Sequence, residues 1–247
     1  MNYRYSLSGM ALAALVFAFT LYPKEINYQK KESLLIYTLV DMLQQLHFSP
    51  IDLDDEFSAV VFDDYIKRLD NRKHFLLKSE VEGLREYRLL LDDEARHGTF
   101  EFFDRSVISI ENGINRAEEI FNKVIEEDFS FDEYETIELD GDKYDFASTE
   151  EELVNFWRQR IKYDILNRAS RQIKRQKDED FDDEVKTNEE LLEDARTKIK
   201  SNYEKRFDNL KRNRRVDWFS TYVNSMVNLY DPHTGYFKPK DKQDFDL

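Results

Sequence analysis

"FDRSVISIENGINRAEEIFNKV", residues 103–124, carries the clearest periodic pattern in the sequence. Its apolar side chains recur at alternating steps of four and three residues: Phe103, Val107, Ile110, Ile114, Ala117, Phe121 and Val124. This seven-residue period places them on one face of a helix that packs against other helices at a shallow angle. Because the pattern lasts for only about three heptads, it favours an internal helix of a bundle over a coiled-coil dimer.

Helical periodicity continues on both sides of this stretch. Apolar stripes with steps of three and four residues run through 35–46, 57–69, 81–95, 153–173, 191–210 and 216–230. The chain has only 6 glycines and 4 prolines in 247 residues, and 36% of its residues are charged. Few breakers and many charges are typical of long helices with solvated faces. We therefore predict a mainly α fold, a multi-helix bundle that occupies residues 33–230.

Start and stop signals divide these stripes into helices. Three pairs have the spacing of a capping box, in which each side chain accepts a hydrogen bond from the other residue's backbone N–H. The pairs are Ser79 with Glu82, Thr149 with Glu152, and Thr187 with Glu190. Pro50 and Gly98 are natural ends, and we expect one continuous helix from Ser79 to Gly98.

Residues 128–149 interrupt the helical period. Tyr134, Thr136, Ile137 and Leu139 suit a strand, and Asp140-Gly141 is a turn signal. We expect an ordered excursion or a small hairpin across the bundle, a β-like element near residues 128–149. Its many carboxylates raise the possibility of a calcium site, but the spacing of an EF-hand is absent, so a solvated acidic loop is favoured.

Residues 1–24 have the pattern of a targeting segment and are not expected to belong to the fold. Arg4 precedes an uncharged apolar run over residues 7–22, which is followed by Pro23 and Lys24. A charge followed by a short apolar run is typical of an export signal. We expect a signal peptide or membrane anchor, and hence a periplasmic or inner-membrane-anchored protein. A buried N-terminal helix is the alternative.

Composition excludes several kinds of chemistry. Acidic residues outnumber basic ones by 52 to 37, and the net charge of −15 repels nucleic acid and anionic lipid at long range. The chain has no cysteine, so thiol catalysis and thiolate metal sites are absent. The four histidines are far apart, and we predict that each is an ordinary surface or loop residue: His47, His74, His97 and His233. We predict no catalytic, cofactor-binding or metal-binding residue.

The stretch Lys205–Arg215 is strongly basic, although the chain as a whole is acidic. It has six basic residues and one acid, but its sequence matches no compact nucleic-acid recognition motif. A solvated helix end near the negative pole of the helix is the favoured interpretation. Ion pairing with acidic faces of this chain or of a partner is a second use of the same charges.

The end of the chain holds a stiff aromatic segment, "NLYDPHTGYFKP", residues 228–239. Proline removes a backbone donor and restricts the residue before it, so Asp231-Pro232 is expected to end the last helix. Gly235 permits a turn, while Tyr236 and Phe237 are expected to anchor the chain to a neighbouring domain and Pro239 to direct it onward. Alternatively, these aromatic rings fold back on the helical core. The candidate junction residues are Asp231, Pro232, His233, Thr234, Gly235, Tyr236, Phe237 and Pro239.

Three segments together resemble the tail-specific (carboxy-terminal processing) proteases. "VNSMVNLYDPHTGYFKPKDKQDFD" (223–246) looks like the junction that leads from their helical region into a PDZ domain. "LDDEFSAVVFDDYIKRLDNRKHFLLKSEVEGL" (53–84) and "TEEELVNFWRQRIKYDIL" (149–166) are similar to the helical region itself. The resemblance covers about residues 35–247, and the ordered set of segments is more specific than the Asp-Pro-His-Thr tetrapeptide alone.

The resemblance implies a non-catalytic N-terminal module. The family's serine nucleophile and lysine base lie far downstream of Asp-Pro-His-Thr, so we transfer no catalytic residue and expect no peptidase activity from this chain, a fragment or truncated product. Residues 231–247 would lead toward an absent PDZ and protease body, with roles in interdomain packing and substrate access. The implied partners are those domains, protein substrates, and an adaptor or sister subunit, but no nucleic acid.

Two alternatives remain open from the sequence. One is a free-standing helical adaptor or scaffold in the periplasm. The other is a helical protein that binds nucleic acid through Lys205–Arg215, which a functional export signal would oppose.

Overall fold

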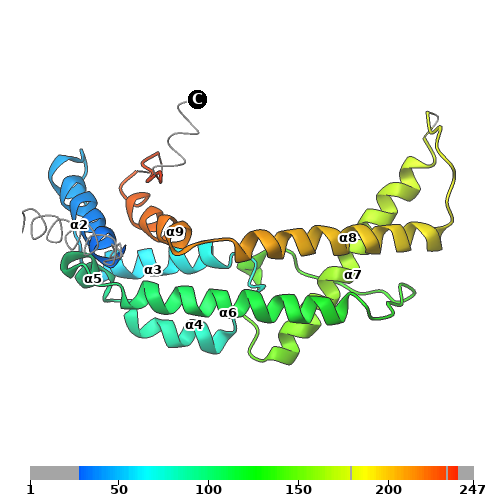
Figure 1. The fold of residues 1–247 in the computed structure, drawn as a ribbon, viewed down its shortest axis with the longest axis horizontal. Coiled ribbons are helices and arrows are strands. Elements are labelled where there is room, and N and C mark those ends of the chain that lie inside the picture. The colour runs from blue at the N-terminus through cyan, green and yellow to red at the C-terminus, as the bar shows by residue number, and fades with distance from the viewer. Residues whose placement is uncertain (1–27, 179, 232, 239–247) are drawn as a thin grey trace, which may run out of the picture.

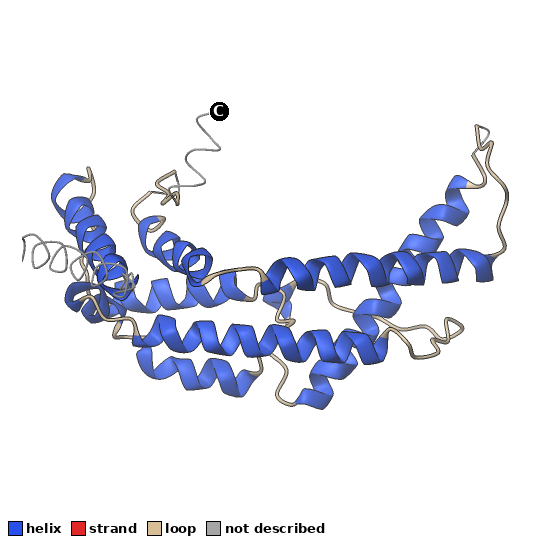
Figure 2. Ribbon diagram, viewed as in Figure 1, coloured by secondary structure: helices blue, strands red, loops and turns tan. Residues whose placement is uncertain are grey.

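The computed structural model describes residues 28–178, 180–231 and 233–238. That part of the chain contains eight α-helices and no strand, so the mainly α prediction is confirmed (Figure 2). The helices, labelled as in Figure 1, are α2 (Tyr28–Leu46), α3 (Asp55–Leu69), α4 (Lys78–Leu84), α5 (Leu91–His97), α6 (Glu101–Val124), α7 (Glu150–Arg175), α8 (Asn188–Lys211) and α9 (Arg215–Val227). None of the described helices is both long and apolar enough to cross a bilayer. The predicted signal peptide or membrane anchor, residues 1–24, lies outside the described residues.

The molecule is elongated, with α6 and α8 running along its long axis (Figure 1). At one end α7 crosses steeply and packs against α8, and the loop between these two helices forms the tip. At the other end α2 packs on α5, while α9 packs on α3 and α6. The two ends therefore differ in character: one is a helical hairpin, and the other gathers α2, α5 and α9.

Helix α6 is the centre of the core. All seven residues of its predicted apolar stripe are buried, from Phe103 to Val124. Gly113 is buried on the same helix because the backbone of Phe75 crosses there. A Cβ atom at residue 113 would lie 2.8 Å from the carbonyl oxygen of Phe75. The connection between α3 and α4 is thus pressed directly onto α6.

A buried carboxylate organises that connection. Asp70 follows the last residue of α3, and its side chain accepts hydrogen bonds from the backbone N–H groups of His74 (2.8 Å), Phe75 (2.8 Å) and Leu76 (2.9 Å). Burial raises the pKa of the Asp70 carboxyl, and the three donors act in the opposite direction. Three otherwise orphaned N–H groups of the turn therefore depend on one side chain.

His74 lies within this turn but is buried, so the prediction of an ordinary surface or loop residue is wrong about its environment. Its ring packs against Phe75, Phe156 and Trp157, and neither ring nitrogen has a hydrogen-bond partner. The indole N–H of Trp157 donates to the His74 carbonyl oxygen (3.1 Å). Burial lowers the pKa of His74 to about 3, and the positive charges of nearby arginines add to the effect: Arg206, Arg160 and Arg72.

Residues 128–149 form an ordered excursion but no hairpin. Their single β-bridge is parallel and joins Ala147 to Leu77. The Asp140-Gly141 turn signal therefore does not close a hairpin. Gly141 instead allows a close approach, because a Cβ atom there would lie 2.1 Å from the carbonyl oxygen of Asn71. The Tyr144 hydroxyl donates to the Arg72 carbonyl oxygen (2.7 Å). The excursion is thus tied to the α3–α4 connection rather than to itself.

The predicted helix starts and stops are partly confirmed. Thr149 and Thr187 cap α7 and α8 by accepting from the backbone N–H groups of Glu152 and Glu190. Gly98 ends α5 with a left-handed φ of 67°.

The predicted cap at Ser79 is wrong, because the N-cap of α4 is Leu77, two residues earlier, and its backbone N–H donates to Glu80 (2.7 Å). The expected single helix from Ser79 to Gly98 is divided into α4 and α5 by a 3₁₀ turn over Arg85–Tyr87.

Candidate interdomain junction

The last described segment, residues 233–238, folds back along α9. The Asn228 side chain donates to the Thr234 carbonyl oxygen. Asn224 donates to the Tyr236 carbonyl oxygen (3.1 Å) and accepts from the Tyr236 backbone N–H (2.7 Å). The Lys238 ammonium group lies 2.5 Å from the carboxylate of Asp217 in the first turn of α9. The segment therefore runs antiparallel to α9, from its C-terminal end toward its N-terminal end.

The helix ends earlier than the position of Asp231-Pro232 predicts. The α-helix stops at Val227, and the following turn is closed by i→i−3 bonds from Leu229 and Tyr230. Asp231 then starts a tight turn, in which its carboxylate accepts from the His233 backbone N–H (2.8 Å) and its carbonyl from that of Thr234 (2.9 Å). The tightening of the last turn by 3₁₀-type bonds satisfies carbonyls that the α-helix leaves open.

The candidate aromatic residues have different environments. Tyr236 is half-buried and packs against the hydrophobic core, as the fold-back alternative expects, whereas Phe237 remains 64% exposed. His233 is exposed, and a Cβ at Gly235 would meet only ordinary contacts, 3.7 Å from the Phe237 ring. Pro232 and Pro239 lie outside the described residues.

Helix α2 is fixed to the same end of the molecule. Near its C-terminal end, the Gln44 side chain donates to the Tyr230 hydroxyl (2.9 Å), and the His47 ring meets the Tyr230 ring edge-on at 5.6 Å. Near its N-terminal end, Arg215 pairs with Glu32 at 2.8 Å and with Asp104 of α6 at 2.5 Å. The C-terminal ends of α2 and α9 project from the same side of the molecule (Figure 1).

Apolar side chains are exposed beside this contact. Leu46 is 74% exposed and Phe48 is fully exposed, while Val60 is also exposed. Val60 and the half-buried Leu229 line a surface hollow of about 380 Å³, together with Ile51, Asp52, Asp54, Glu56 and Phe57. We call Leu46, Phe48, Val60 and Leu229 the junction surface. The Gln44 side chain donates to the Ile51 carbonyl oxygen, which places the end of α2 beside this hollow, and contiguous exposed apolar patches mark interaction sites.

The basic stretch is used largely within the chain. Lys211 pairs with Glu118 of α6 at 2.6 Å, and Arg215 is held by the two acids described above. Arg214 lies 3.8 Å from Asp217. Lys205 and Arg206 instead line a hollow on α8. The charges of Lys205–Arg215 are thus divided between ion pairs and one helix face, so the second use, ion pairing with acidic faces of this chain, accounts for part of them.

The polar side chains that hold the junction were not predicted from the sequence. Asp217, Asn224 and Asn228 are spaced by seven and four residues, so they share one face of α9. This shared face is the signal that the sequence offers. Across the described ranges, no group of three or more histidine, aspartate and glutamate side chains is placed to hold a metal ion.

Comparison with known proteins agrees with the sequence resemblance. The family model for "Tail specific protease N-terminal domain" matches residues 39–240, from α2 through the junction. The tail-specific protease of Haemophilus influenzae (strain ATCC 51907 / DSM 11121 / KW20 / Rd) is 25% identical over 250 residues. The alignment covers 98% of this chain and 33% of that protein, so the chain spans about a third of the length of this relative.

Proposed function

The chain belongs to the tail-specific protease N-terminal domain family, and from that premise we propose that it is a non-catalytic helical module that packs against the catalytic part of such a protease. The parent activity would be that of a serine endopeptidase with a serine–lysine dyad, as the resemblance implies. The observation that carries the proposal is the family match over residues 39–240, which includes the junction segment. The two thirds of the relative that lie outside the alignment would then hold the catalytic residues.

The junction surface is the proposed contact with the catalytic part. It lies at the end of the molecule that carries α2 and α9, and residues 233–238 return along α9 as far as Asp217, so a following domain would join the module at this same end. Covering Leu46 and Phe48 would remove two largely exposed apolar side chains from water, each worth about 1.5–3 kcal/mol when fully buried. The Gln44 side chain donates hydrogen bonds to Tyr230 and Ile51, which fix this surface before a partner binds. Such preorganisation lowers the entropy cost of binding.

We further propose that the protein works in the periplasm, either free or anchored in the inner membrane. The support is the charge-then-apolar pattern of residues 1–24. In that setting the module would position the catalytic part and shape the access of protein substrates.

A binding experiment tests the proposed contact. The purified chain is mixed with the Haemophilus influenzae protein from which the aligned N-terminal third has been removed, and the complex is measured by calorimetry. We expect a one-to-one complex that the double substitution Leu46→Ser/Phe48→Ser weakens at least about tenfold, since it removes apolar burial. Val185→Ser provides the matched control, because Val185 is 71% exposed at the opposite tip, between α7 and α8.

Two results would contradict the proposal. The first is a folded, monomeric chain that forms no complex, which would favour the free-standing adaptor. The second is a complex that Val185→Ser weakens and Leu46→Ser/Phe48→Ser does not, which would move the contact to the helical hairpin.

A further inference from the structure

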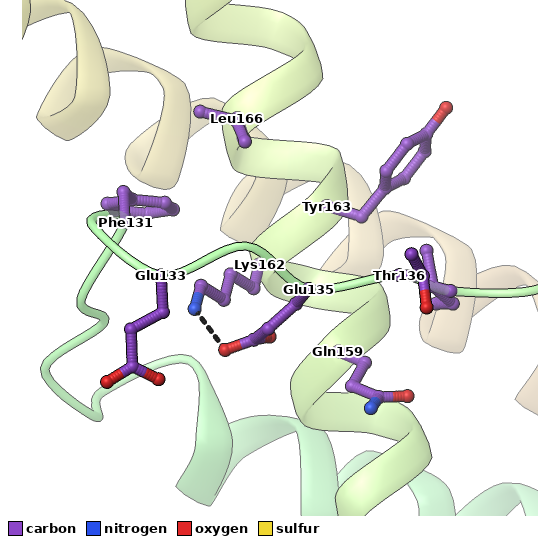
Figure 3. Close-up of a pocket in the computed structure, with 9 residues that line it drawn as sticks. Phe131, Glu133, Glu135, Thr136, Gln159, Lys162, Tyr163 and Leu166 are labelled. Atoms are coloured by element: carbon purple, nitrogen blue, oxygen red, sulfur yellow. Dashed lines mark hydrogen bonds and ion pairs between the residues drawn. The ribbon is translucent and has the colours of Figure 1, made fainter.

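A lone extended segment crosses α7 within the excursion. From Glu133 to Ile137, no backbone N–H or C=O group makes a hydrogen bond to another described residue. Phe131, Glu133, Glu135, Thr136 and Ile137 line a hollow against α7, whereas the Tyr134 side chain is 94% exposed. Figure 3 shows the segment passing over Gln159, Lys162 and Tyr163 of α7.

Contacts on both sides hold this segment in its extended form. Lys162 of α7 pairs with Glu135 at 2.6 Å and lies 5.9 Å from the centre of the Phe131 ring (Figure 3). Before the segment, the Arg196 guanidinium lies 5.3 Å from the centre of the Phe129 ring. After it, Asp142 pairs with Lys67 of α3 at 2.7 Å. A segment fixed in this way has already lost much of the conformational entropy that pairing would cost.

Open space and negative charge surround the segment. The hollow beside Ile137 and Leu166 is about 90 Å³, and a larger one of about 480 Å³ extends toward Glu127 and Arg158. Of the five acids over residues 132–140, Asp132, Glu133 and Glu138 form no ion pair with any described residue. A neighbour on this strand would therefore meet apolar side chains from α7 and an uncompensated negative potential.

We propose that residues 133–137 are an edge strand that binds an extended, basic peptide segment of a partner protein by β-augmentation. Unpaired N–H and C=O groups of a strand edge are a template for another chain, and main-chain bonds then supply affinity while alternate side chains supply specificity. Lysine or arginine at alternate positions of the partner complements the three unpaired acids. This site lies on α7, away from the junction surface, and does not depend on the function proposed above.

Peptide binding to the full chain, measured by fluorescence anisotropy, tests this site. The probe is a labelled peptide of alternating lysine and valine, Lys-Val-Lys-Val-Lys-Val-Lys, blocked at both ends. Two matched peptides accompany it: one with glutamate in place of lysine, and one N-methylated at its five central residues so that neither edge can donate there. We expect the N-methylated peptide to bind at least about tenfold more weakly, since two or more hydrogen bonds are lost. The acidic peptide should not bind measurably.

Protein variants locate the contact. Glu133→Pro and Thr136→Pro each remove one N–H, from opposite edges of the strand, so at least one of them should weaken binding about tenfold. Thr136→Ala keeps the backbone donor and should bind like the unmodified chain. Equal binding of the N-methylated and unmodified peptides would show mere charge attraction and overturn the proposal. So would binding that neither proline substitution changes, or equal affinity for the acidic peptide.

Discussion

Replacement of Asp70 by alanine is expected to lower the free energy of unfolding by about 3–5 kcal/mol. The substitution leaves the N–H groups of His74, Phe75 and Leu76 without their acceptor in a turn that is pressed against α6. Because these donors are buried, water cannot replace the carboxylate without opening the turn. Urea unfolding followed by circular dichroism at constant pH measures the change.

Asp63→Ala is the matched control for this experiment. Asp63 also belongs to α3, but its carboxylate is exposed and pairs with Arg88 at 2.7 Å. An exposed ion pair contributes about 0–1 kcal/mol, so the control should unfold at nearly the original urea concentration. A loss below about 1 kcal/mol for Asp70→Ala would show that the turn does not depend on its carboxylate.

His74→Phe is expected to make the stability of the protein less sensitive to acid. The folded protein holds His74 neutral down to a pKa of about 3, whereas the unfolded chain binds the proton near pH 6.5. The unfolded state therefore binds more protons between these values, and stability falls as pH decreases through this window. Between pH 7 and pH 4.5 this single group should cost the folded state about 2.5 kcal/mol.

The histidine variant should lose that part of the pH dependence. At pH 7 it should be at least as stable as the unmodified protein, because a phenyl ring replaces two buried nitrogens that lack partners. Unfolding free energies measured from pH 4.5 to pH 7.5 give the slope of each protein. The exposed His97 supplies a control, His97→Phe, which should keep the original slope. A His74→Phe protein with an unchanged slope would place the titrating group elsewhere.

Local periodicity predicted the parts of the fold that local physics decides. The α6 stripe is buried as its seven-residue period requires, and Thr149 and Thr187 cap the helices that they precede. These features depend on residues three to seven positions apart, which a sequence displays directly. Gly98 ended its helix for the same local reason.

Features that depend on distant contacts were not visible in the sequence. His74 is buried because Phe156 and Trp157 of α7 pack on it, more than eighty residues away along the chain. Gly141 serves a close approach to Asn71 rather than a hairpin, which pattern alone does not distinguish. At the junction, the sequence displays the aromatic segment, but the return of this segment along α9 depends on Asn224 and Asn228, whose spacing does not by itself specify a partner.

We propose that this helical module carries no peptidase chemistry and supports chemistry that resides on a larger protein. The most direct measurement compares the rates at which three proteins cleave a model substrate with an accessible C-terminal tail. They are the isolated chain, the Haemophilus influenzae protein without its aligned N-terminal third, and a chimera in which this chain replaces that third. We expect no cleavage by the isolated chain and a faster rate for the chimera than for the shortened protein. Cleavage by the isolated chain, or a folded chimera no faster than the shortened protein, would contradict it.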